Sequence, residues 1–167
     1  MAAEFIGGGA YRAGMPVSPY ISSLRAVVGS RLLLVPTVSV WPRNAAGQIL
    51  LVRSTDDGLW GTVGGMVEVG ESPDEAARRE AQEEAGVDVR LTRILDAVGG
   101  TAFEHHYVNG DHVANVAVIY EAEVVAGDPH PDGDETMDVR WFHPRELAAL
   151  SLNTFARSAF TRLGLLP

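Results

Sequence analysis

Hydrophobic and polar positions follow helical spacing near the start of the chain. Ser18 and Pro19 suit the cap and first position of a helix, and Gly29 suits its end. Between them, apolar residues recur at intervals of three and four, at Tyr20, Ile21, Leu24, Val27 and Val28. A short helix over 19–28 is therefore predicted. The residues before it hold a GGGA run without periodicity, and we interpret them as a frayed lead-in.

Runs of branched and alternating residues predict strands on both sides of a central acidic helix. Pro36 lies inside the first run and favours an edge or a bend, because proline cannot donate to a ladder. Asn109-Gly110 predicts a hairpin before the longest strand. Strands are expected over 32–41, 48–53, 89–107 (one or two), 112–125 and 139–142, with short pieces over 58–70 and closing helices over 144–150 and 153–163. Since hairpins outnumber crossovers, the order predicts an α+β fold around a mixed sheet.

The central helix is expected over 73–85 because both of its ends carry boundary signals. Ser72 and Glu75 have the spacing of a capping box, in which each side chain bonds to the other residue's backbone. Pro73 suits the first helical position. Gly86 suits the left-handed position that follows a last turn.

Three glutamates crowd one face of this helix. Glu80, Glu83 and Glu84 lie beside a stripe of alanines spaced four apart, so the acids adjoin the packed face. Like charges three and four apart destabilise a helix by about 0.2–0.5 kcal/mol per pair. A divalent cation would reverse that effect, and ligands that offer only oxygen suit Mg²⁺ or Mn²⁺. A solvated acidic face is the alternative interpretation.

Composition excludes several kinds of chemistry. The chain has no cysteine, and all 13 basic residues are arginine, which excludes thiol nucleophiles, lysine Schiff bases and a Walker-type phosphate loop. A net charge of −9, concentrated in residues 65–87, argues against a nucleic-acid polymer as partner. No apolar run has the length of a membrane span and the first residues lack the pattern of a signal peptide, so no membrane association and a cytoplasmic location are expected.

The segment GMVEVGESPDEAARREAQEEAGV, residues 65–87, resembles the Nudix box at every fixed position. These positions are Gly65, Glu71, Arg79, Glu80, Ala81, Glu83, Glu84, Gly86 and Val87. The resemblance extends over residues 34–148. It implies a Nudix fold, a mixed β-sheet sandwiched between helices (α/β/α), within one domain over 31–167 that follows a lead-in and short helix over 1–30. It also implies Mg²⁺- or Mn²⁺-dependent hydrolysis of a nucleoside diphosphate linked to another moiety.

The resemblance also implies roles for individual residues. Glu80, Glu83 and Glu84 resemble metal ligands, and the Gly65 carbonyl resembles a further one. Arg79 and Glu71 resemble supports that hold the catalytic glutamates and the loop before the helix. An acidic residue in a later loop is expected to join the metal site, and Glu135 is the best candidate beside Asp132 and Asp134. The general base is left open between Glu80 and Glu135.

Residues outside the box are expected to hold the base and sugar of a small-molecule nucleotide. The candidates for substrate binding are Arg53, Trp60, Phe103, His105 and Tyr107. Core packing is the alternative for the aromatic ones, since alternate strand residues face a core. His105 and His106 are not expected to share a metal ion, because neighbouring strand residues point to opposite faces.

The substrate is not fixed by the sequence. An ADP-ribose or nucleotide-sugar type is expected, and an (oxidised) nucleoside triphosphate pyrophosphohydrolase is the alternative. A non-catalytic nucleotide sensor on the same fold and a calcium-binding or structural acidic domain are further alternatives, which the complete box disfavours. The oligomeric state is left open, with a homodimer as one option.

Overall fold

The computed structural model describes residues 18–106 and 110–167. The elements, in chain order, are α1 (Pro19–Val28), β1 (Leu33–Arg43), β2 (Ile49–Ser54), β3 (Trp60–Thr62), α2 (Pro73–Ala85), β4 (Asp88–Val98), the 3₁₀ helix η1 (Thr101–Phe103), β5 (Glu104–His106), β6 (His112–Ala126), β7 (Thr136–Phe142), the 3₁₀ helix η2 (Pro144–Ala149) and α3 (Thr154–Arg162). The predicted helices and strands are therefore found. Tyr107 and Asn109 lie outside the described residues, although β5 and β6 pair as the predicted hairpin requires.

A mixed seven-stranded sheet organises the fold. Its main path runs β3-β2-β1-β6-β4, with β5 added to β6 and β7 added to β2. Among the strands of the described residues, only β1 and β6 are parallel, and they pair from Leu33↔Val113 to Arg43↔Glu123. The other strand pairs are antiparallel. The predicted α+β class and mixed sheet are confirmed.

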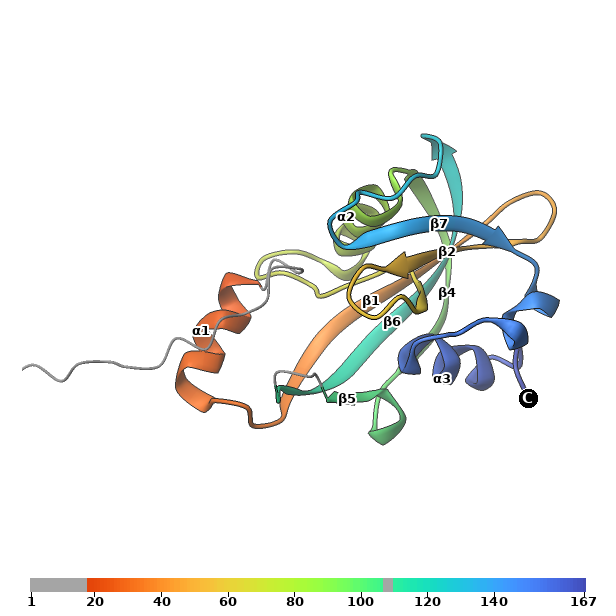
Figure 1. Cartoon of the computed structure of the whole chain (residues 1–167). Helices are drawn as coiled ribbons and strands as arrows, with labels where there is room; N and C mark the ends of the chain where they lie inside the picture. Colours follow the sequence, from red (N-terminus) through yellow and green to blue (C-terminus); the bar gives the residue numbers. More distant parts are fainter. Residues whose placement is uncertain (1–17, 107–109) are drawn as a thin grey trace, which may run out of the picture.

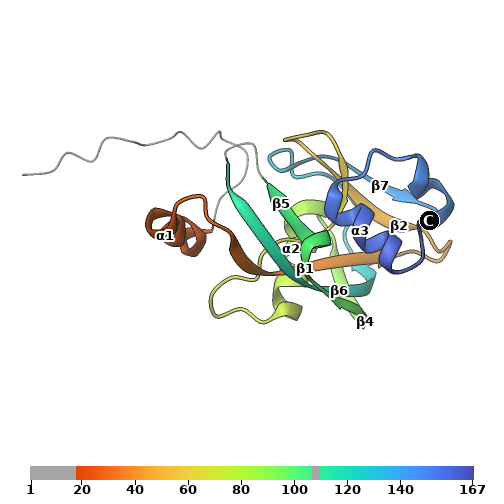
Figure 2. The same ribbon diagram turned by 90° about the horizontal axis from the view of Figure 1, so that it is seen from below.

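The helices α2 and α3 cover opposite faces of this sheet (Figures 1 and 2). Successive residues of β1 point to opposite faces, so Val40 packs under α2 while Trp41 packs under α3. The Trp41 ring meets Phe160 of α3 with 4.7 Å between centroids. On the other face, α2 contributes a stripe of fully buried alanines, which allows its backbone to lie close to the strands.

Pro36 does not lie at an edge, which corrects the expectation from the sequence. Its strand, β1, has β6 on one side and the segment 63–67 on the other. Val38 and Val40 donate to the carbonyls of Gly65 and Val63, while the Pro36 carbonyl accepts from Val67. Pro36 lies at the end of this short ladder and takes part in it through its carbonyl alone.

One helix lies apart from the layers. Figure 1 shows α1 at one end of the sheet, next to the loop that leads into α2. Within residues 18–106 and 110–167, no helix has the length and apolar character needed to cross a membrane.

Candidate active site

The helix α2 is fixed at both ends by the residues that the sequence singled out. At its start, the Ser72 N–H donates to the Glu75 carboxylate at 2.8 Å, as in a capping box. At its end, Gly86 is left-handed, with φ 66° and ψ 25°. A Cβ there would lie 2.1 Å from the exposed His130 ring, which would have to move. The glutamates of the helix are therefore held at a defined place over the sheet.

Two glycines before α2 bring the backbone against those glutamates. Gly64 has φ 147°, and a Cβ on it would lie 2.1 Å from the Val38 carbonyl oxygen. Its N–H donates to Glu84 Oε2 at 2.8 Å. A Cβ on Gly65 would lie 2.3 Å from Glu80 Oε1. The absence of side chains at both positions thus lets Glu80 and Glu84 lie directly against the turn.

The carbonyl of Gly65, the predicted backbone ligand, belongs to the ladder with β1. It accepts from the Val38 N–H at 2.9 Å. A carbonyl oxygen has two lone pairs, so this bond leaves one acceptor position for a ligand.

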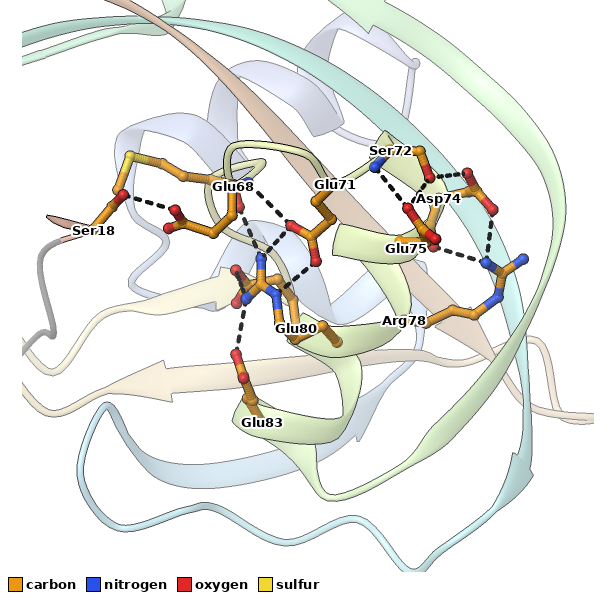
Figure 3. Close-up of polar contacts among 11 residues, drawn as sticks. Ser18, Glu68, Glu71, Ser72, Asp74, Glu75, Arg78, Glu80 and Glu83 are labelled. Atoms are coloured by element: carbon orange, nitrogen blue, oxygen red, sulfur yellow. Dashed lines mark hydrogen bonds and ion pairs between the residues drawn. The ribbon is translucent and has the colours of Figure 1, made fainter. Parts of the chain in front are cut away.

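Arg79 binds three acidic side chains, Glu71, Glu80 and Glu83, which are labelled in Figure 3. Its Nε and Nη2 donate in bidentate fashion to Glu71 at 2.8 and 2.9 Å. Its Nη1 donates to Glu80 at 2.7 Å and to Glu83 at 2.8 Å, and Nη2 also reaches the Met66 carbonyl at 2.9 Å. The Arg79 guanidinium holds the pKa of Glu71 below its usual range. This geometry is the one expected of supports that tie the loop to α2.

Glu135 lies among the same charges, although it comes from the loop before β7. Burial, followed by the negative charges of Glu80, Asp132 and Glu83, raises its pKa to about 7. In the described part of the chain, no side chain donates a hydrogen bond to its carboxylate. Glu135 is therefore the loop acid with an uncompensated charge near the α2 glutamates.

Asp132, an alternative to Glu135, is used within the loop itself. Its Oδ1 accepts from the backbone N–H groups of Asp134, Glu135 and Thr136 at 3.1, 3.1 and 2.8 Å. Burial acts to raise its pKa, but these N–H groups hold the pKa of Asp132 below its usual range. Asp132 therefore shapes the loop that presents Glu135.

Two carboxylates of α2, those of Glu80 and Glu84, are destabilised in their charged forms. Burial raises the pKa of Glu80, against the opposing effect of Arg79. Burial raises the pKa of Glu84 well above its usual range, and the charges of Glu80 and Glu135 add to this. Such a set, composed of oxygen donors with excess negative charge, fits a hard divalent cation.

The acidic side chains described above do not form a compact metal-binding group in this structure. Within residues 18–106 and 110–167, no three histidine or acidic side chains are grouped closely enough to hold an ion. The Arg79 guanidinium instead bridges Glu80 and Glu83. The side chain of Glu83 is 57% exposed, so it can change its rotamer without disturbing the core.

The prediction that Trp60 and Phe103 bind substrate is corrected by the structure, because both rings pack in the core. Trp60 and Phe103 are 8% and 4% exposed, and both lie in the core on the α3 face, opposite α2. Trp60 meets Phe142 edge-on at 4.8 Å, and Phe103 meets Phe155 at 5.4 Å. Neither ring is available to stack on a base.

The other substrate candidates have different positions. Arg53 donates from Nε to the Gly58 carbonyl at 2.8 Å and so closes its own loop. His105 is exposed on β5, and a role in binding stays a prediction, while Tyr107 lies outside the described residues. His106 stacks on His112, with 3.7 Å between the ring centroids.

Sequence reasoning missed Thr136. Its buried hydroxyl donates to the Glu84 carbonyl at 2.8 Å and links the end of α2 to the loop of Glu135. No local pattern marks this residue, because its partner lies 52 residues away.

Comparison with known proteins gives one consistent family. The profile of the NUDIX domain matches residues 33–163. The NAD-capped RNA hydrolase NudC of Stutzerimonas stutzeri (strain A1501) is 32% identical over 142 residues, which cover 77% of this chain and 48% of that protein. A putative 8-oxo-dGTP diphosphatase of Bacillus subtilis (strain 168) is 33% identical over 104 residues, which cover 62% of this chain and 63% of that protein. This chain thus spans about half the length of the NudC relative.

Solved structures share the fold. A MutT protein from Methanosarcina mazei Go1 superposes with a TM-score of 0.64 at 23% identity, covering 78% of this chain and 93% of that one. A UDP-X diphosphatase superposes with a TM-score of 0.62 at 19% identity, covering 87% of this chain and 70% of that one.

Proposed function

Because the chain belongs to the NUDIX domain family, we propose that it is a divalent-metal-dependent hydrolase that cleaves the pyrophosphate linkage of a nucleotide. One observation carries the proposal. Glu80 and Glu84 of α2 lie against the glycine turn, and Glu135 faces them from a separate loop. These three carboxylates repel one another, and neither Glu84 nor Glu135 has a cationic side chain as partner among the described residues. This excess of negative charge supports a metal site at this place.

The proposed ligands are Glu80, Glu83, Glu84 and Glu135, together with the Gly65 carbonyl. When bound there, Mg²⁺ or Mn²⁺ supplies neutralisation of phosphate oxygens and acidification of a water molecule. Arg79 and Glu71 would keep the loop against α2, since their bidentate pair fixes the orientation of both side chains. The protein's main contribution is then positioning and charge, as in other phosphoryl transfers.

Glu135 suits the role of general base in this scheme. Its pKa of about 7 describes the metal-free protein, and a bound cation would lower it. The choice of Glu135 therefore rests on its position beside the α2 glutamates without a side-chain donor among the described residues. Glu80 is the alternative, because its pKa is also raised by burial. Its hydrogen bond to Arg79, at 2.7 Å, stabilises its charged form and makes it the weaker candidate.

For the substrate, we propose a nucleoside diphosphate linked to a second moiety. Support comes from relatives named for NAD-capped RNA and from solved structures named for UDP-X and ADP-ribose. A nucleoside triphosphate substrate is the second candidate, favoured by the relative named for 8-oxo-dGTP. The net charge of −9 favours a small molecule over a nucleic-acid polymer.

A substrate panel tests this proposal. The full chain is incubated with Mg²⁺ or Mn²⁺ and, separately, ADP-ribose, a UDP-sugar, NADH, 8-oxo-dGTP, dGTP and NAD-capped RNA, and products are identified by mass. We expect hydrolysis of a linked diphosphate into two monophosphate products. Release of pyrophosphate from a triphosphate would instead support the second candidate. Binding of a nucleotide without metal and without any turnover would contradict the proposed enzymatic activity and favour a non-catalytic nucleotide sensor.

A further inference from the structure

The helix α1 precedes the matched family region, yet its last turns are anchored to the sheet. Arg25 is 7% exposed and donates to the carbonyls of Gly29 and Arg31 beyond the end of α1. Its Nη2 also reaches the carbonyl of His112 at 2.9 Å, at the start of β6. Its Nε pairs with Asp111 at 3.3 Å. One end of α1 is thereby fixed against the central strands.

The other end of α1 contacts the loop that leads into α2. Ser18 is 6% exposed, and its hydroxyl donates to Glu68 Oε2 at 2.8 Å, across 50 residues of sequence. The sequence predicts Ser18 as the cap of α1. It does lie at that position, but its side chain makes no capping hydrogen bond. The hydroxyl is therefore directed to the loop and not to its own helix.

From Glu68, hydrogen bonds continue to the glutamates of α2 (Figure 3). The Glu68 N–H donates to Glu71 Oε2 at 3.0 Å. Glu71 accepts the bidentate pair from Arg79, and Arg79 in turn bonds Glu80 and Glu83. The contacts from α1 to two proposed metal ligands are thus unbroken.

Packing alone does not fix the loop against α1. A cavity of about 250 Å³ lies between them, lined by Leu24, Leu34, Pro36, Met66, Val67 and Val69 among others. Val69 of the loop and Leu34 of β1 are 75% and 72% exposed, so the described residues make few apolar contacts with this part of the loop. The Ser18–Glu68 hydrogen bond joins helix and loop at the edge of this cavity.

We propose that Ser18 is a positioning residue for the metal site, acting through Glu68 and Glu71 on Arg79, Glu80 and Glu83. This inference rests on the proposed function. With the Ser18 hydroxyl in place, the Glu68 carboxylate is held and its peptide N–H points at Glu71. Without it, the loop samples orientations in which Glu71 loses that donor, and Arg79 no longer holds the glutamates in one arrangement.

The test measures Mn²⁺ binding directly, by electron paramagnetic resonance of the free ion, without substrate or turnover. Ser18→Ala is expected to weaken Mn²⁺ binding about tenfold, the lower end of what outer partners of metal ligands contribute. Ser23→Ala is the matched control, because Ser23 lies in α1 and its hydroxyl bonds, among the described residues, only to the Tyr20 carbonyl of the same helix. Ser18→Thr keeps the hydroxyl and is expected to restore binding.

A double-mutant cycle separates the specific contact from general loosening. Glu68→Ala is expected to weaken Mn²⁺ binding as Ser18→Ala does, and the double variant no further, since both remove one contact. Thermal unfolding of each variant checks that the fold is kept. If Ser18→Ala does not fold, Glu68→Ala alone carries the test, and unchanged binding in it overturns the inference.

Glu84→Gln serves as the reference that separates this inference from the proposed function. Weaker binding in Glu84→Gln with wild-type binding in Ser18→Ala would overturn the inference and leave the metal site standing. Wild-type binding in Glu84→Gln would overturn the metal site itself. Equal losses in Ser18→Ala and Ser23→Ala would also contradict a specific role for Ser18.

Discussion

The Glu84 carboxylate accepts a 2.8 Å hydrogen bond from the backbone N–H of Gly64, 20 residues earlier in the chain. This bond joins α2, which carries the acidic face, to the segment 63–67, which pairs with β1. Burial raises the pKa of this carboxylate well above its usual range. Among the described residues, the Gly64 N–H is the one donor that stabilises its charged form, and the carboxylate has no cationic partner. A site built in this way favours a cation, because the ion removes a repulsion that the fold already contains.

The turn itself is the first place to test this arrangement. Gly64→Ala would place a Cβ 2.1 Å from the Val38 carbonyl, at a φ of 147° that side chains rarely adopt. We expect the free energy of unfolding to fall by about 3 kcal/mol or more, since backbone strain alone costs about 1–3 kcal/mol. Urea unfolding measures the loss. Gly70→Ala is the control, because its φ is 88° but no atom lies within 4 Å of the new Cβ. Equal losses in the two variants would show that the close approach to β1 has no cost.

Arg79 tests the role of the bidentate pair. Arg79→Lys keeps the charge but loses the fork that binds Glu71 through two nitrogens. We expect turnover to fall about 10- to 100-fold, as for other residues that orient metal ligands. Arg78→Lys is the matched control, because Arg78 is an exposed neighbour that pairs, within the described part of the chain, only with Asp74. Comparable rates for both variants and the wild-type protein would contradict a supporting role for Arg79.

Glu135 gives a pH dependence whose sign follows from its raised pKa. Its pKa is about 7 in the folded protein, against an ordinary value of 4.5, so the folded state binds the proton more tightly. The contribution of this group to stability is therefore full below pH 4.5 and is lost as the pH rises from about 4.5 to 7. The contribution of Glu135 therefore makes the melting temperature of the metal-free protein higher at pH 5.5 than at pH 8, and thermal unfolding at the two pH values measures the difference. Glu135→Gln is expected to reduce the difference, and an unchanged difference would contradict the burial of this charge.

Trp60 tests the correction made to the substrate site. Trp60→Ala removes a ring that lies in the core beneath α3, and truncation of a buried aromatic costs about 3–5 kcal/mol. We expect Trp60→Ala to lower the free energy of unfolding. The KM of the protein that remains folded is expected to change little. Trp60→Phe keeps most of the packing and is expected to be milder. A large rise in KM for Trp60→Phe at unchanged stability would restore the ring as a substrate contact.

Local signals predicted those parts of the fold whose cause is local. The bounds of α2 follow from Ser72, Glu75 and Gly86, which lie next to the backbone groups that they satisfy. The crowding of Glu80, Glu83 and Glu84 needs only the helical repeat. The roles of Arg79 and Glu71, by contrast, were expected only from the resemblance to the Nudix box, and no local pattern indicates their contact.

Features that depend on distant segments could not be predicted in this way. Trp60 and Phe103 face the α3 core because of where the strand order places β3 and η1, which no pattern in either segment reveals. Pro36 sits inside the sheet because the irregular segment 63–67 pairs with β1. Ser18 has the sequence of a helix cap, and only the docking of α1 turns its hydroxyl to Glu68.

The most direct test of the central claim is metal-dependent turnover of the substrate found in the panel, in the wild-type protein and in Glu84→Gln. Glu123→Gln is the control, since it removes the same charge from an exposed pair on β6. We expect the wild-type protein and Glu123→Gln to hydrolyse the substrate only with Mg²⁺ or Mn²⁺. We expect Glu84→Gln to lose about a thousandfold or more in kcat, as when a group that stabilises transition-state charge is removed, while keeping its fold. Wild-type turnover in Glu84→Gln, or turnover that persists when EDTA removes the metal, would contradict the account.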